Sequence, residues 1–208
     1  EHFPVYLLLG IVMWNFFTEA TGQGMQAIVA RGDLIRKINF PKYIIVISGT
    51  ISALINLLFN LVIVFVFMLI NSVDIKATIL LLPFNIIELY VFALAIAFFL
   101  GAAFVKFRDI GHIWDVLMQA AFYATPILYP LSMVIGISKT AAQIMMLNPV
   151  AQTIQDARYN AITHETTTIN GIIENPIWLI VPHVIVLAAI VAATLYFRSK
   201  QRYFAEAV

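Results

Sequence analysis

The segment Leu34-Ile-Arg-Lys-Ile-Asn-Phe-Pro-Lys42 is a short basic stretch that separates two long apolar runs. Proline lacks a backbone N–H and disfavours a helical conformation in the residue before it. We therefore expect one helix to end near Phe40 and another to begin at Pro41. Lysine and arginine at the ends of apolar runs mark the cytoplasmic side of a membrane. The segment is predicted to be a bend on the inner face, and the topology can be counted from it.

The composition indicates a protein that lies within a membrane. The chain has 208 residues, of which 62% are hydrophobic and 11% charged, with a mean hydropathy of +0.94. Soluble domains are nearer half apolar and a quarter charged. The net charge of +1 gives no basis for a nucleic-acid partner, and the absence of cysteine excludes disulfides and thiol chemistry. We predict an all-α integral membrane protein.

The apolar runs predict about five transmembrane helices in a single domain of residues 1–208. Their expected ranges are 5–29, 43–70, 79–104, 113–129 and 177–197. The fourth is shorter than the roughly 20 residues that a crossing needs, because Pro126 and Pro130 end it early. The chain begins without an initiator methionine, directly before an apolar run, so we expect a fragment that lacks its natural N-terminus.

The distribution of basic residues agrees with this topology. Three of them fall on the outer side: Lys76, Lys139 and Arg158. The other nine fall on the inner side: Arg31, Arg36, Lys37, Lys42, Lys106, Arg108, Arg198, Lys200 and Arg202. An inner excess of lysine and arginine is the pattern that orients membrane proteins.

Residues 130–176 are too apolar for a plain loop, and we expect short re-entrant or interfacial helices there, on the outer side. One helix is predicted over 139–147 and another over 149–162, with a break at Asn148-Pro149. Irregular backbone at membrane depth requires cover from protein or a water-filled cavity. The second helix has an apolar face and a polar face, and the polar face consists of Gln152, Gln155, Asp156 and Arg158.

Two glutamates, Glu19 and Glu88, lie within predicted spans. A carboxylate that faces lipid costs a few kcal/mol, so both should face protein or water. They are either part of a buried, hydrogen-bonded stripe or part of a conduit wall. His183 is alone on its span and is interpreted as a structural imidazole. Near His112 the sequence supplies no nucleophile and no third ligand, so no catalytic or metal site is predicted.

Several short motifs occur in one order along the chain: Tyr6-Leu-Leu-Leu-Gly10, Trp14-Asn-Phe-Phe17, Leu34 to Pro41, Phe107-Arg-Asp-Ile110, Pro126-Ile-Leu-Tyr-Pro130 and Leu147-Asn-Pro149. This order resembles the membrane subunit of type 2 ABC exporters, in the branch that exports O-antigen, capsular polysaccharide or teichoic acid. The resemblance implies a permease in the bacterial cytoplasmic (inner) membrane that moves a lipid-linked polysaccharide. It also implies a homodimer above two separate ATPase subunits. The family's N-terminal interfacial helix and first span would be missing here.

The resemblance assigns roles to three groups of residues. The coupling contacts to the ATPase would be Leu34, Ile35, Arg36, Lys37, Phe40 and Pro41, with Phe107, Arg108 and Asp109 at a second bend. The outer gate would contain Pro126, Pro130, Asn148, Pro149 and Arg158. Candidate residues of the polymer path are Trp14, Phe17, Glu19, Glu88, Tyr123 and Tyr129, although the aromatic ones could equally pack between helices or form an interfacial belt.

The chain has no glycine-rich phosphate loop, so energy must come from a partner. We expect no cofactor or metal on this chain, and we expect ATP and Mg²⁺ to be bound by the ATPase subunit. Two other readings stay open. One is a lipid or drug exporter of the same superfamily. The other is an integral-membrane enzyme of glycan or lipid metabolism, which would need a concentrated constellation of acids or histidines in one loop.

Overall fold

A computed structural model describes residues 2–37 and 40–204, and within them the regular structure is helical, without strands. The long helices are α1 (Phe3–Ala30), α3 (Tyr43–Ile70), α4 (Leu82–Lys106) and α9 (Pro176–Lys200). The shorter helices are α2 (Gly32–Lys37), α5 (Ile110–Ala124), α6 (Leu131–Ile137), α7 (Lys139–Met146) and α8 (Pro149–Ala161). Three 3₁₀ turns complete the order: η1 (Ala77–Leu81), η2 (Ile169–Gly171) and η3 (Gln201–Tyr203).

Among the described residues, four helical segments are long and apolar enough to cross a membrane: Phe3–Ala30, Tyr43–Ile70, Ala77–Lys106 and Pro176–Tyr203. They confirm the predicted all-α membrane protein and match four of the five predicted spans. The remaining predicted span, 113–129, corresponds to α5, which has 15 residues. At 1.5 Å per residue it extends about 22 Å, short of the roughly 30 Å hydrocarbon core.

The predicted end of this short helix at residue 129 is wrong. It ends at Ala124, and Thr125 has an extended backbone with φ −99° and ψ 140°. The cause is Pro126, which disfavours a helical conformation at the residue before it. Residues 125–130 therefore form a loop that leads from α5 into α6.

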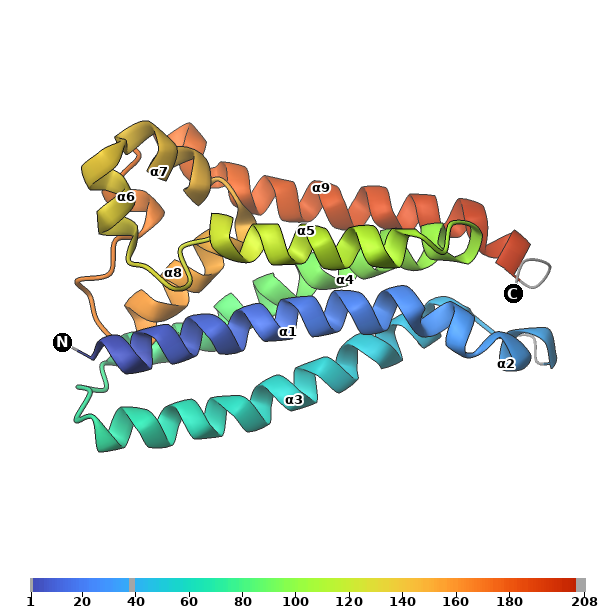
Figure 1. Cartoon of the computed structure of the whole chain (residues 1–208), viewed down its shortest axis with the longest axis horizontal. Helices are drawn as coiled ribbons and strands as arrows, with labels where there is room; N and C mark the ends of the chain where they lie inside the picture. Colours follow the sequence, from blue (N-terminus) through green and yellow to red (C-terminus); the bar gives the residue numbers. More distant parts are fainter. Residues whose placement is uncertain (1, 38–39, 205–208) are drawn as a thin grey trace.

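The helices run along one axis and separate two ends of the molecule (Figure 1). One end holds α2, the α4–α5 turn and the C-terminal end of α9. The other end holds α6, α7 and α8, and α8 packs against α1, α4 and α9. The predicted bends and the predicted outer helices therefore lie at opposite ends, as the topology requires.

Helix α1 is at the centre of the fold and packs against both α3 and α4. The approach to α4 is close at Gly24, where an added Cβ atom would lie 2.4 Å from the Cβ of Ala97. Small residues at such crossings let membrane helices pack tightly. By contrast, most apolar side chains of α3 and α9 point outward. These two helices present the surfaces that suit lipid.

The basic bend differs from its predicted form. Helix α2 ends at Lys37 and α3 begins at Tyr43, so no helix ends at Phe40 or begins at Pro41. The bend instead contains the short helix α2 as an element of its own. Two residues of the quoted motif, Ile38 and Asn39, lie outside the described residues.

Candidate translocation groove, outer gate and docking surface

A groove between α1 and α5 brings together two of the predicted path residues. Trp14 from α1 and Tyr123 from α5 both line a cavity of about 390 Å³, together with Asn15, Thr18, Met118, Gln119 and Phe122. We call this cavity the α1–α5 groove. Its walls combine aromatic rings with amide and hydroxyl groups, which is the mixture that a sugar ring can use for stacking and hydrogen bonding.

A second cavity shares Trp14 and Met118 with the α1–α5 groove and extends to Asn148. This cavity, of about 190 Å³, is lined by Trp14, Phe17, Phe92, Trp114 and Asn148, among others. Phe17 stacks against Phe92 with ring centroids 5.7 Å apart. Trp14 lines both cavities, so one indole ring joins the groove to the region of the Asn148 break.

Tyr129 also contacts the wall of the groove, from the loop after α5. Its hydroxyl donates a hydrogen bond of 2.9 Å to the backbone carbonyl of Tyr123. Burial raises the pKa of the Tyr129 hydroxyl, so it stays protonated and able to donate at neutral pH. Tyr129 thereby ties the loop to the end of α5.

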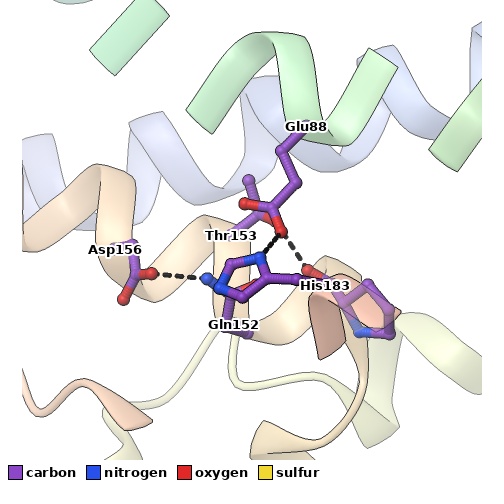
Figure 2. Close-up of polar contacts among 6 residues, drawn as sticks. Glu88, Gln152, Thr153, Asp156 and His183 are labelled. Atoms are coloured by element: carbon purple, nitrogen blue, oxygen red, sulfur yellow. Dashed lines mark hydrogen bonds and ion pairs between the residues drawn. The ribbon is translucent and has the colours of Figure 1, made fainter. Parts of the chain in front are cut away.

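The two intramembrane glutamates lie away from the α1–α5 groove. Glu19 accepts hydrogen bonds from Asn56 of α3 (2.6 Å) and from Gln23 of α1 (2.8 Å). These hydrogen bonds fit one part of the buried, hydrogen-bonded stripe that the sequence left open as one of two readings, but Glu19 is only half-buried. Glu88 lies at the outer end of α4, buried against α8 and α9, where its carboxylate binds His183 (Figure 2).

The network around Glu88 is the part of the site that sequence reasoning missed. Glu88 Oε1 contacts His183 Nδ1, and Gln152 donates to Asp156 on α8 (Figure 2). His183 is therefore hydrogen-bonded, which agrees with its interpretation as a satisfied structural imidazole, but its partner Glu88 was not predicted. The sequence did contain a hint of this pair, because Glu88 and His183, 95 residues apart, both lie in the outer halves of predicted spans.

Most of the polar face predicted for α8 is buried, while its fourth member, Asp156, is half-buried. Gln152 and Gln155 are at most 1% exposed, and Arg158 is fully buried, as are the apolar residues of the opposite face. Of the two predicted forms, re-entrant or interfacial, this burial fits the re-entrant one, because α8 is packed against α1, α4 and α9. Its polar groups bond to protein, as irregular or polar structure at this depth requires.

Arg158 fastens three segments together at the outer end. Its guanidinium donates to the backbone carbonyls of Tyr6 (3.0 Å), Pro126 (2.7 Å) and Ile127 (2.8 Å). It also donates to the side chain of Gln155 at 3.0 Å and lies 3.7 Å from the centroid of the Tyr6 ring. Burial lowers the pKa of Arg158 to about 10, which leaves the group charged at neutral pH.

The other predicted gate residues form the boundaries of the short outer helices. Asn148 accepts a hydrogen bond of 3.0 Å from the backbone N–H of Val150 and so caps α8, and Pro149 occupies the first turn. Pro130 precedes α6, and Pro126 supplies a carbonyl to Arg158. The break at Asn148-Pro149 lies where the sequence predicted it, between α7 and α8.

At the opposite end, the predicted docking residues are mostly exposed. Leu34 is 42% exposed and Phe107 55%, while Arg36, Lys37, Arg108 and Asp109 are exposed charged groups. Pro41 is exposed as well, Phe40 is half-buried, and Ile35 is buried and anchors α2. These residues form an apolar and basic surface, which we call the inner surface.

Asp109 and Arg108, at the second bend, make neither a capping bond nor an ion pair with each other within the described residues. Asp109 precedes α5 but makes no side-chain capping bond, because its backbone is helical and not extended. Arg108 does not pair with Asp109; its guanidinium lies 5.4 Å from the centroid of the Phe104 ring. Both charged groups remain accessible from the inner side.

Comparison with known proteins identifies the family. Residues 3–162 match the model of the family described as ABC-2 type transporter. The chain is 30% identical over all of its 208 residues to the O-antigen export system permease protein RfbA of Myxococcus xanthus, covering 76% of that protein. It is 23% identical over 154 residues to RfbA of Klebsiella pneumoniae, which is 74% of this chain and 58% of that protein. The chain belongs to the ABC-2 type transporter family of membrane proteins.

Proposed function

We propose that this chain is the permease of an ATP-driven exporter that moves a polysaccharide, of the lipid-linked O-antigen, capsule or teichoic acid type, across the bacterial cytoplasmic membrane. The observation that carries the proposal is the similarity over the whole chain to an O-antigen export permease. The arrangement of the molecule supports it, with a basic inner surface at one end and broken helices at the other.

The source of energy would be a separate ATPase subunit that docks on the inner surface and binds ATP and Mg²⁺. Exposed leucine and phenylalanine beside arginine give the apolar and charged contacts typical of protein interfaces. The inner surface offers Leu34 with Arg36 at the first bend and Phe107 with Arg108 at the second. Closure of the ATPase would push both bends together, and the long helices would carry the movement to the outer end.

The polymer path would follow the α1–α5 groove. Its aromatic residues, Trp14 and Tyr123, would stack on sugar rings, while Asn15, Thr18 and Gln119 would bond hydroxyls. Helix α5 buries none of its residues within the described chain, so it has a face left for a partner. We propose that a second copy of the permease covers α5 and completes the path in a homodimer.

The docking proposal is tested by charge reversal at the first bend. Arg36→Glu with Lys37→Glu should abolish co-purification with the ATPase subunit, because two attractive charges become repulsive. The control is Lys76→Glu with Lys139→Glu, which reverses two exposed lysines at the outer end and should leave association intact. Retained binding and ATP turnover in the first pair would contradict the docking role.

The path proposal is tested by Trp14→Ala. The variant should export less polysaccharide while its association with the ATPase is unchanged, because Trp14 is far from the inner surface. Phe59→Ala removes an exposed aromatic ring on α3 and serves as the control. Normal export by Trp14→Ala would reject the α1–α5 groove as the path. Accumulation of a lipid or drug in place of polysaccharide would favour the other exporter class.

A further inference from the structure

Four polar side chains from three helices converge at the outer end of the bundle. Glu88 comes from α4, Gln152 and Asp156 from α8, and His183 from α9 (Figure 2). The imidazole of His183 binds Glu88, and the amide of Gln152 donates to Asp156. The first pair joins α4 to α9, the second lies within α8, and both lie where α8 packs against α4 and α9 (Figure 2).

Two buried oxygens of this network lack a hydrogen-bond donor. Among the described residues, Glu88 Oε2 and Gln152 Oε1 have no partner, although Glu88 is 8% exposed and Gln152 1%. A carboxylate and an amide oxygen are both acceptors, so they cannot satisfy each other. A buried acceptor without a donor is costly. A protonated carboxyl group would add the donor that the ionised network does not have.

The charges in the network lead to the same conclusion. The carboxylate of Glu88 binds the imidazole of His183, and the half-buried carboxylate of Asp156 lies within range of the charges of both. Burial, reinforced by the charge of Glu88, raises the pKa of Asp156 to about 6, although the hydrogen bond from Gln152 and the charge of His183 oppose the shift. Asp156 thus changes its charge near neutral pH.

The ionisable groups of the other elements that pack against α8 contact residues other than Asp156. Helix α1 contributes Tyr6, which lies against Arg158 and bonds Gln155. Helix α7 carries Lys139, which pairs with Glu174 at 3.2 Å on the surface. Near η1, Thr78 bonds His164 beyond the end of α8. The described groups that act on the charge of Asp156 are Glu88 and His183.

We propose that Glu88, Asp156 and His183 form a proton-binding site that fastens the gate helix α8 to α4 and α9 when a proton is bound. The inference rests on the proposed function only in treating α8 as part of the outer gate. With the proton present, Asp156 is neutral beside the Glu88–His183 pair. Without it, the half-buried Asp156 carries a second negative charge, which repels that of Glu88 and weakens the attachment of α8.

The direction of the pH effect follows from the raised pKa. In the attached state Asp156 binds its proton more tightly than in an open, hydrated state, where the ordinary value of 3.8 applies. The stabilising contribution is complete below pH 3.8 and is lost as the pH rises through about 6. Asp156 has a pKa of 3.8 in the open state and about 6 in the attached state. The equilibrium constant for opening α8 is therefore about tenfold larger at pH 7 than at pH 5.

The first experiment measures the proton directly. Infrared difference spectra of the whole chain in lipid nanodiscs, titrated from pH 4 to 8, should show a protonated carboxyl band that disappears with a midpoint near 6. The band should be absent in Asp156→Asn and retained in the control Asp74→Asn, which changes an exposed aspartate. A spectrum without a carboxyl titrating near pH 6, or a band that persists in Asp156→Asn, would overturn the site.

The second experiment measures the attachment of α8. Hydrogen–deuterium exchange of residues 149–161, corrected for intrinsic rates, should be about tenfold faster at pH 7 than at pH 5 in the unmodified chain. In Asp156→Asn the change should fall below about twofold, with exchange as slow as at pH 5. Equal pH dependence in both proteins would refute the coupling. Neither readout needs the ATPase or a polysaccharide, so failure of export would leave the proton site standing.

Discussion

The two ends of the molecule keep their charged groups in opposite ways. At the inner end, Arg36 and Arg108 are exposed and make one weak ion pair and one distant ring contact. At the outer end, Arg158 is fully buried and donates four hydrogen bonds, three of them to backbone carbonyls. The charged groups of the inner end stay accessible, whereas Arg158 at the outer end is used in contacts within the chain.

The largest expected difference between the two ends comes from removing an arginine from each. Arg158→Ala should lower the free energy of unfolding by about 3–5 kcal/mol, because the backbone carbonyls that accept from Arg158 lose a charged hydrogen-bond donor. Arg108→Ala should lower it by less than about 1 kcal/mol, the scale of an exposed cation–π contact. Thermal unfolding in one detergent measures both. Equal losses would contradict the contrast between the ends.

A smaller effect is expected from adding one methyl group near Arg158. A Cβ atom at Gly10 would lie 2.0 Å from Arg158 Nη2, and the guanidinium cannot move away without breaking its bonds. Gly10→Ala should therefore cost about 1–3 kcal/mol, the range for overpacking. At Gly22 on the same helix an added Cβ meets nothing within 4 Å. Gly22→Ala should be neutral or stabilising. A loss there as large as at Gly10 would count against tight packing around Arg158.

Helix capping gives the smallest of the expected differences. Asn148 caps α8 through its side chain, whereas Asp109 precedes α5 without a capping bond. Asn148→Ala should cost about 1 kcal/mol, and Asp109→Ala close to nothing. Unfolding measurements on both variants decide the point. A loss for Asp109→Ala that matches Asn148→Ala would mean that the second bend is more tightly held than its contacts indicate.

The parts of the fold that depend on local chemistry were predictable from the sequence. Long apolar runs gave four spans, prolines set the breaks near Pro126 and Pro149, and the basic residues gave the two ends. Each of these follows from neighbours along the chain, so no tertiary contact is needed to infer it.

What the sequence could not supply depends on distant contacts. Arg158 donates to the backbone carbonyls of residues 6, 126 and 127. Every residue has a backbone carbonyl, so the order of side chains does not show which ones Arg158 binds. The Glu88–His183 pair joins residues 95 positions apart. The two faces of α8 were predicted, but not the burial of residues on both, because helical periodicity separates two faces without telling what covers each.

The sidedness of the two ends is the most direct test of the account. The chain has no cysteine, so single cysteines at Lys37, Arg108 and Asn148 can each be labelled with a membrane-impermeant thiol reagent in intact cells. We predict that Asn148→Cys reacts from outside, and that Lys37→Cys and Arg108→Cys react only after the membrane is opened. Labelling of Lys37→Cys or Arg108→Cys from outside, or protection of Asn148→Cys until opening, would contradict an inner docking surface and an outer gate.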